Sequence, residues 1–231
     1  MLVNLGDITT VRSDHANTTV WVADVLRSRI AAGELPPGTK LSEQQLAASM
    51  QVSRNTLREA FTMLSIESVV TRFPNRGVFV AAPDADAVRE IYRVRRMLEP
   101  AALLWGPDLD VERLDAVVAA AREAKSRGDV PEMAAANQAF HEALIAMSGS
   151  LQLQQMMSRV LAEMRLVFHA MSAQPDFHSG YVEENAGLVE LLRNGRRVEA
   201  ADAMRGYLDA AEAELLEHLE ANQPSLPTSG R

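Results

Sequence analysis

Residues 35–80 constrain the fold of this chain more than any other stretch. They contain two short helical patterns, each preceded by a serine, and then two β-branched runs that flank a turn. Ser42 and Ser53 are favourable helix starts, because a serine oxygen accepts a hydrogen bond from the free N–H groups of the first turn. The order helix, turn, helix and hairpin predicts a winged helix-turn-helix.

The second helix of this motif has one apolar and one polar face. Leu57, Phe61 and Leu64 follow one another at spacings of four and three, which places them on the buried face. Arg54 and Arg58 stand one turn apart on another face. The major groove of DNA admits one helix, and arginine matches the acceptors of guanine and phosphate. The spacing alone would equally suit a surface helix with two solvated arginines.

A hairpin after this helix favours the DNA interpretation. Residues 69–72 and 78–80 are β-branched and aromatic runs on either side of Pro74-Asn75-Arg76-Gly77. We expect a two-stranded wing whose tip, with its backbone and one cation, reaches the sugar–phosphate backbone beside the groove.

Charge is distributed unevenly along the chain. The formal net charge of the 231 residues is −8. Residues 1–82 carry eight Lys and Arg and seven Asp and Glu, a net of +1, and residues 83–231 carry fifteen and twenty-four, a net of −9. An acidic body repels DNA, whereas a near-neutral head can approach it. Affinity for DNA must therefore come from a few well-placed arginines and from two heads acting together.

The remainder of the chain is predicted to be helical. Apolar residues make up 47% and aromatic residues only 5%, which favours packed helices. From residue 84 the apolar period becomes 3.6. We predict helices at about 84–105, 109–127, 130–148, 150–172, 178–193 and 196–221, with a break at Gln174-Pro175. Short loops between them would make an antiparallel bundle.

These patterns predict a mostly α protein: an N-terminal winged helix-turn-helix and a C-terminal all-α antiparallel helical bundle. We expect a flexible arm at 1–16, a DNA-binding domain at 17–82, a helical effector-binding and dimerisation domain at 83–221 and a flexible tail at 222–231. The chain has no Cys, which excludes disulfides, thiolate metal sites and catalysis by cysteine. It shows no targeting pattern and no apolar run of membrane-spanning length, so a soluble cytoplasmic protein is expected.

Four motifs in the first 82 residues resemble the winged helix-turn-helix of the GntR family of bacterial transcription regulators. They are Pro36-Pro37-Gly38, Leu41-Ser42-Glu43, the run 52–60 with its Val-Ser-Arg and Arg-Glu-Ala, and Arg76-Gly77. The resemblance implies that DNA is contacted by the second helix and the wing tip, through Ser53, Arg54, Asn55, Thr56, Arg58, Asn75, Arg76 and Gly77. Many members carry Arg where this chain has Gln44, which would also face DNA but brings no charge.

The helical part resembles the FCD effector domain of the FadR-like branch of that family. Residues 94–99 and 137–141 carry this resemblance, and six helices rather than seven resemble the shorter, VanR-like version. The resemblance implies a small-molecule effector and a homodimer.

Arg95 is notable without any family knowledge. Its spacing from Val88, Ile91 and Ala102 places it on the apolar stripe of a helix. A buried guanidinium is costly unless it is paired. Arg95 therefore either pairs with an internal carboxylate or reaches out of the bundle, or it anchors an anionic effector. The family resemblance favours the anchor.

Asn137 and His141 stand one turn apart and could ligate one metal from one helix face. A single histidine on a half-apolar helix is more often a structural or pocket residue. Many FCD domains bind a divalent metal through this pair and two further histidines, and the matching positions here are Asn185 and Tyr207. Amide and neutral phenol are poor ligands, so we expect that site to be lost or much weakened. The resemblance leaves a polar effector pocket of Arg95, Asn137, His141, Asn185 and Tyr207.

Together these features predict a non-enzymatic, ligand-responsive DNA-binding regulator, a repressor that binds a palindromic operator of double-stranded DNA as a homodimer. A small organic acid or similar anion would be its effector. Two alternatives stay open. The bundle could be a small metalloenzyme on a DNA-binding head, or it could only dimerise, or hold a metal, without any effector.

Overall fold

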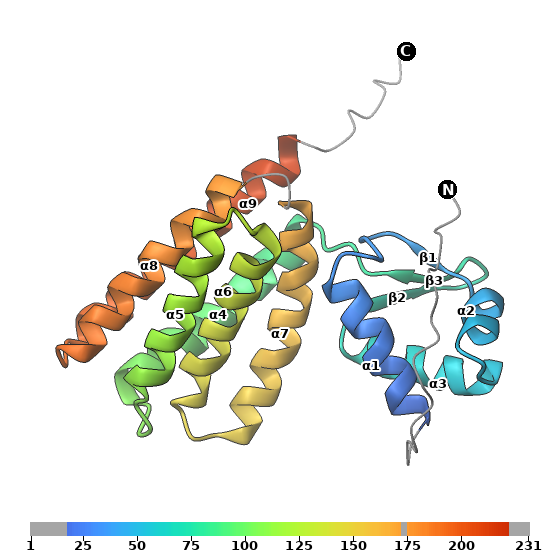
Figure 1. Ribbon diagram of the computed structural model, residues 1–231, viewed down its shortest axis with the longest axis horizontal. Coiled ribbons are helices and arrows are strands. Elements are labelled where there is room, and N and C mark those ends of the chain that lie inside the picture. The colour runs from blue at the N-terminus through green and yellow to red at the C-terminus, as the bar shows by residue number, and fades with distance from the viewer. Residues whose placement is uncertain (1–17, 172–174, 222–231) are drawn as a thin grey trace. The chain divides into compact units, whose positions relative to one another are not determined.

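The computed structural model describes residues 18–171 and 175–221 (Figure 1). The described residues fall into two compact units, one formed by 18–82 with 161–171 and the other by 83–160 with 175–221. The predicted arm at 1–16 and tail at 222–231 lie outside the described residues. None of the described helices is long and apolar enough to cross a membrane.

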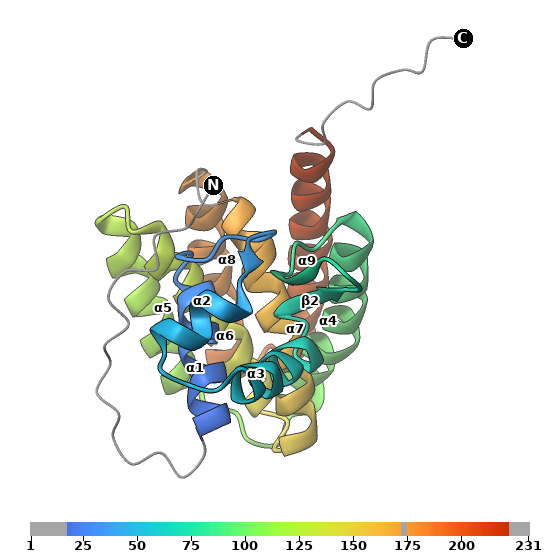
Figure 2. The same cartoon turned by 90° about the vertical axis from the view of Figure 1, so that its right-hand side faces the viewer.

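The first unit contains a winged helix-turn-helix, as the sequence predicts (Figure 2). Its elements are α1 (Thr18–Ala31), β1 (Lys40–Leu41), α2 (Glu43–Ser49), α3 (Arg54–Ile66), β2 (Val70–Phe73) and β3 (Gly77–Val80). Leu57, Phe61 and Leu64 of α3 are fully buried and share one core with residues of α1, α2 and the sheet. This core fixes which face of α3 remains outside.

Both predicted serine caps are present. The Ser42 hydroxyl accepts from the backbone N–H of Gln45 at 3.4 Å, and that of Ser53 accepts from Thr56 at 3.0 Å. Between the two helices, Gln51 has a left-handed φ of 53°, and the N–H of Val52 bonds to the carbonyl of Ala47 at 3.0 Å. A left-handed residue with such a bond is a common helix ending, and here it makes the tight turn.

The wing is a sheet of three strands in the order β1-β3-β2, with both neighbours antiparallel to β3. Thr71 pairs with Phe79, and Phe73 pairs with Gly77 beside the turn. The expected two-stranded wing is thus incomplete, because Lys40 and Leu41 add a third strand. Two residues are too few to show an alternating pattern.

The helical unit is built from the six expected helices. They are α4 (Ala85–Trp105), α5 (Val111–Ser126), α6 (Val130–Ala146), α7 (Leu151–Ala170), α8 (Pro175–Arg193) and α9 (Arg197–Ala221), and residues 161–170 of α7 belong to the first unit. The largest difference from the predicted boundaries is the start of α8, which lies at Pro175 rather than at residue 178. Proline suits a first helical position, where its missing N–H would have no helical partner.

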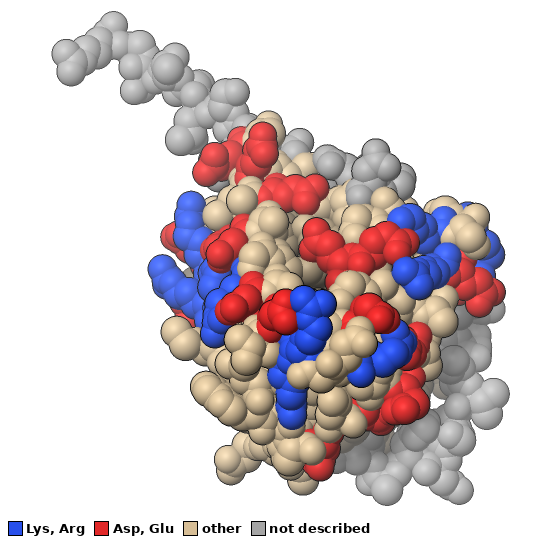
Figure 3. Space-filling view, turned by 90° about the vertical axis from the view of Figure 1, so that its left-hand side faces the viewer, with Lys and Arg blue, Asp and Glu red and all other residues tan. Residues whose placement is uncertain are grey.

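Within this unit α4 packs along α9, and α5 packs against α6 and α8. Positive and negative side chains are interspersed on the face shown in Figure 3. Cross-helix ion pairs join α5 to α8, between Arg122 or Lys125 and Glu183 and between Asp115 and Arg193. Such exposed pairs contribute little to stability, so the apolar core is the main source of cohesion in this unit.

Candidate functional site

The exposed face of α3 carries the residues predicted to contact DNA. Ser53, Arg54, Asn55 and Arg58 are exposed, and Thr56 is half-buried, with its hydroxyl 2.8 Å from that of Ser53. The cap therefore orders the start of the helix, where polar side chains are closest to a groove that receives it.

These side chains differ in how free they are. Arg54 makes no hydrogen bond or ion pair within the described part of the chain. Arg58 donates through Nε to Glu43 of α2 at 2.8 Å, and Asn55 donates to Glu59 at 3.2 Å. A contact to DNA would therefore cost Arg54 no bond within the described part of the chain, whereas Arg58 and Asn55 would each have to give up an internal partner.

The wing tip holds one cation over two aromatic rings. The guanidinium of Arg76 lies 5.4 Å from the ring centre of Phe73 and 6.0 Å from that of Phe79, and the two rings meet edge to face at 5.5 Å. Asn75 and Gly77 have φ values of 59° and 106°, as a tight turn requires. All three residues of the predicted tip are exposed, as is Gln44 on α2.

Arg72 of β2 was not singled out by the sequence. Its Nη2 donates to the backbone carbonyl of Arg58 at 2.7 Å and to the hydroxyl of Thr62 at 2.9 Å. No local pattern signals these bonds, because they join a strand to a helix that precedes it in the chain.

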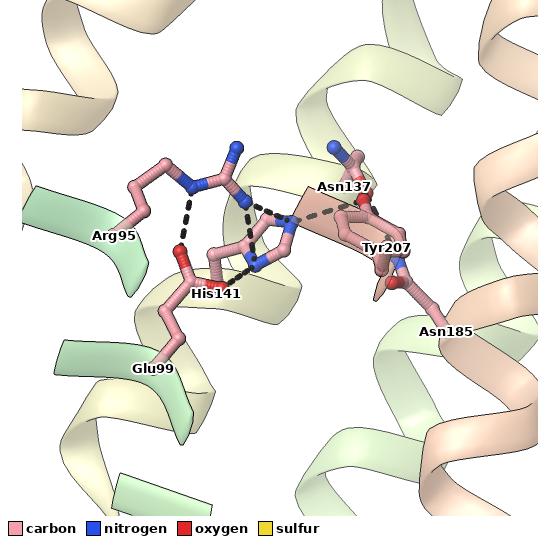
Figure 4. A network of polar contacts seen from close by, with 6 residues as sticks. All are labelled: Arg95, Glu99, Asn137, His141, Asn185 and Tyr207. Atoms are coloured by element: carbon pink, nitrogen blue, oxygen red, sulfur yellow. Dashed lines mark hydrogen bonds and ion pairs between the residues drawn. The ribbon is translucent and has the colours of Figure 1, made fainter. Parts of the chain in front are cut away.

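The five predicted pocket residues meet inside the helical unit, where a sixth, Glu99, joins them (Figure 4). They come from four helices: α4, α6, α8 and α9. Arg95, Glu99 and His141 are at most 1% exposed, so their charges and hydrogen bonds must be satisfied within the protein rather than by water. Asn137, Asn185 and Tyr207 are also buried.

Arg95, Glu99 and His141 form a closed triangle. Arg95 Nε donates to Glu99 Oε1 at 2.6 Å, and Arg95 Nη2 lies 2.9 Å from His141 Nε2. His141 Nδ1 lies 2.8 Å from Glu99 Oε2. These contacts assign the proton of a neutral His141 to Nδ1, facing the carboxylate, and leave Nε2 to accept from Arg95.

The pKa values of the triangle follow from burial and from these neighbours. Burial alone would raise the pKa of Glu99, but Arg95 and His141 lower it to about 2. Burial lowers the pKa of His141, and Glu99 only partly opposes this. The triangle therefore holds one positive and one negative charge with a neutral imidazole.

Asn137 connects the triangle to the other two helices. Its Oδ1 accepts from the Tyr207 hydroxyl at 3.1 Å and from Asn185 Nδ2 at 2.8 Å. The Tyr207 oxygen also lies 3.2 Å from His141 Nε2. These bonds fix the orientation of the Asn137 amide, so that its Nδ2 points away from Tyr207 and Asn185.

Some polar atoms of the cluster remain unused. Nη1 of Arg95 and Nδ2 of Asn137 make no hydrogen bond among the described residues, and both point toward the upper part of the view in Figure 4. The buried Asn185 Oδ1 and Tyr92 hydroxyl have no partner within the described part of the chain. Buried polar atoms without a partner are costly and call for a specific explanation.

Two interpretations of Arg95 followed from the sequence: an internal ion pair, or an anchor for an anionic effector. Arg95 does pair with an internal carboxylate, and that partner, Glu99, lies one helical turn away. The spacing could have identified it. Because Glu99 neutralises Arg95 but leaves Nη1 unused, the pairing does not exclude an anchor role.

The donor set fits a first-row metal poorly. Where the family places four ligands, this chain offers one imidazole, two amides and a phenol. Tyr207 is kept protonated because burial raises its pKa. Both nitrogens of His141 already face internal partners. A metal would therefore have to break several internal bonds to gain one good ligand.

Comparison with known proteins agrees with this architecture. The family model for bacterial regulatory proteins of the gntR family matches residues 18–80, and the FCD domain model matches residues 90–210. The chain therefore belongs to the GntR family of regulators that carry an FCD domain. It is a DNA-binding transcription regulator and not an enzyme.

Individual relatives support the same assignment. An HTH-type transcriptional regulator in an unstable DNA locus of Streptomyces ambofaciens is 30% identical over 87% of this chain and 86% of its own. The gluconate operon transcriptional repressor of Bacillus subtilis is 38% identical over 43% of this chain and 40% of its own. A crystal structure assigned as a GntR regulator from Rhodococcus sp. RHA1 is 36% identical, with a TM-score of 0.82 over 86% of this chain and 97% of that one.

Proposed function

We propose that this chain is a transcription repressor that binds a palindromic operator as a homodimer and responds to a small organic acid held in the helical unit. In this proposal Ser53, Arg54, Asn55, Thr56, Arg58 and Gln44 approach the major groove, and residues 75–77 contact the backbone or minor groove. The single observation that carries the DNA role is the capped, exposed face of α3 beside a wing with an ordered cation. Repression is supported by similarity to the gluconate operon repressor.

The effector role rests on the buried cluster. Arg95 Nη1 and Asn137 Nδ2 are unused donors. They come from two different helices, and both nitrogens point in the same direction (Figure 4). One carboxylate could accept from both, and burial would strengthen these charge-assisted bonds. Such a ligand would shift the population of unit orientations and so change operator affinity.

Binding of a carboxylate is expected to take up a proton. Before binding, Arg95 and Glu99 cancel each other and His141 is neutral with a lowered pKa. A ligand anion facing Arg95 would raise the pKa of His141 and favour its charged form. The affinity should therefore increase as the pH falls through the raised pKa of His141 in the bound state, and it should level off only below the lowered pKa of the free state. Isothermal titration in buffers of different ionisation enthalpy measures this uptake.

A matched variant tests the donor role of Asn137. Asn137→Asp keeps the acceptor for Tyr207 and Asn185 but replaces the unused donor by an acceptor. We expect carboxylate binding to weaken at least about tenfold, with operator binding retained. Gln138→Glu, which makes the same change from amide to carboxylate on α6 but outside the cluster, serves as the control. If a thermal-shift screen of small carboxylates is flat while the operator is still bound, the bundle that only dimerises becomes the better account.

For the homodimer, we propose the outer face of α4 and the start of α9. Met97 and Trp105 are each 77% exposed, and Val198 is 65% exposed. Arg197 bonds to the carbonyls of Leu103 and Gly106 at 2.6 Å, which brings Val198 beside the end of α4. An exposed apolar patch of this kind is typical of an interface.

Met97→Glu with Trp105→Glu is therefore expected to convert the dimer to a monomer, because four carboxylates would be buried against apolar surface. Light scattering after size-exclusion chromatography measures the mass. Leu151→Glu, at another exposed apolar position in the same unit, should leave the dimer intact. A double variant that remains dimeric would rule out this face without affecting the DNA-binding proposal.

A further inference from the structure

The wing and the recognition helix are joined by a small polar triangle. Arg72 of β2 donates to the carbonyl of Arg58 and to the hydroxyl of Thr62, at 2.7 and 2.9 Å. The Thr62 hydroxyl in turn donates to the same carbonyl at 2.9 Å. All three contacts lie on exposed residues of the DNA-binding head.

The register of the wing explains why Arg72 can reach α3. Arg72 pairs with Val78, and its neighbours in β2, Thr71 and Phe73, must point to the opposite face of the sheet. Arg72 therefore shares the core-facing side with the buried Val70. Its long side chain leaves the edge of the core and bonds to the helix, while the residue as a whole stays exposed.

Arg58 is held from both ends by this arrangement. Its side chain donates to Glu43 of α2, while its carbonyl accepts from Arg72. When the guanidinium of Arg58 exchanges Glu43 for DNA, the Arg72 bond still fixes the backbone from which it projects. The three DNA-facing elements, α2, α3 and the wing, thus meet at one residue.

We propose that Arg72 is a positioning residue for operator recognition. It sets the wing relative to α3 so that Arg76 at the tip and Arg54 and Arg58 on the helix engage the same operator half-site together. This inference rests on the proposed DNA-binding roles of those three residues. It assigns to Arg72 a function distinct from a phosphate contact, although both would use a guanidinium.

The test uses two variants that weaken the tie in different ways. Arg72→Ala removes both of its bonds and a charge, whereas Thr62→Val removes only the bond to the hydroxyl and leaves the charge unchanged. In the full-length protein on an operator obtained by selection, we expect each to weaken binding roughly three- to tenfold, the effect of one or two lost hydrogen bonds. Thr62→Ser, which keeps the hydroxyl, should bind as the wild type.

Two readouts separate positioning from direct contact. The first is coupling between the two residues. Arg76→Ala should reduce operator affinity much less in the Arg72→Ala background than in the wild type, because a wing that is not positioned contributes little to binding. The second is salt: Thr62→Val should reproduce the loss with an unchanged slope of log affinity against log salt. Protection of the wing side of each half-site from hydroxyl radicals should fall in both variants.

The proposal is overturned if Thr62→Val binds as the wild type while Arg72→Ala lowers the salt slope by about one, the signature of a lost phosphate contact. Additive effects of Arg72→Ala and Arg76→Ala would overturn it as well. Thermal unfolding of each variant shows whether the head remains folded. Failure of the wild type to select any operator would instead count against the DNA-binding roles, so the two failures are distinguishable.

Discussion

Glu99→Ala is expected to lower the free energy of unfolding of the helical unit by about 3–5 kcal/mol, the usual cost of breaking a buried ion pair from one side. The reason is that Arg95, 1% exposed, would keep its charge and lose its only carboxylate partner among the described residues. Denaturation in urea, followed by circular dichroism, measures the difference. Glu90→Ala breaks the exposed pair with Arg93 on the same helix and should cost at most about 1 kcal/mol.

The same pair predicts how stability depends on pH. The pKa of Glu99 is lowered from 4.5 to about 2 in the folded chain. A group with a lowered folded pKa stabilises fully above its unfolded pKa and loses that contribution as the pH falls through the folded value. Wild-type stability should therefore fall between about pH 4.5 and pH 2 more steeply than that of Glu99→Gln. A Glu99→Ala variant within 1 kcal/mol of the wild type would contradict the assigned burial of the pair.

Arg54→Ala with Arg58→Ala is expected to weaken operator binding at least about a hundredfold, since each arginine contact contributes about 1–3 kcal/mol and a dimer presents each residue twice. Arg54 should account for the larger part, because it has no partner to release in the described part of the chain, whereas Arg58 must first leave Glu43. Fluorescence anisotropy over a range of salt concentrations measures the effect.

The control for this variant lies in the other unit. Arg93→Ala removes an exposed arginine of α4 and should leave operator affinity unchanged. The salt dependence should become shallower in the double variant, because phosphate or base contacts that release counterions are lost. If the double variant binds the operator with wild-type affinity, these two arginines of α3 do not contact DNA.

Much of the DNA-binding head can be predicted from the sequence because its determinants are local. Ser42 and Ser53 specify two helix starts within a few residues of the bonds that they accept. The 3-4 spacing of Leu57, Phe61 and Leu64 identifies the buried face, and the exposed face follows from it. The strand β1 escapes prediction because its two residues gain their conformation only from pairing with β3.

The bonds that organise both candidate sites depend on tertiary structure. Arg72 reaches Arg58 across fourteen positions of the chain, and His141 reaches Glu99 across forty-two. Glu99 could have been paired with Arg95 from their spacing of four, but its second bond to His141 could not. The five predicted pocket residues were grouped by family resemblance, and the hydrogen bonds among them come from four helices that converge.

We propose that this chain recognises a specific palindromic operator through α3 and releases it when a carboxylate enters the helical unit. The purified protein is first used to select the genomic fragments that it binds. Its affinity for the selected site is then measured with and without a carboxylate that raises the melting temperature of the protein. We expect one palindrome to be enriched, and we expect Arg54→Ala with Arg58→Ala to abolish that enrichment. The carboxylate should weaken operator binding by the wild type but not by Asn137→Asp. Fragments bound without any shared sequence, or equally by the double variant, would contradict this proposal.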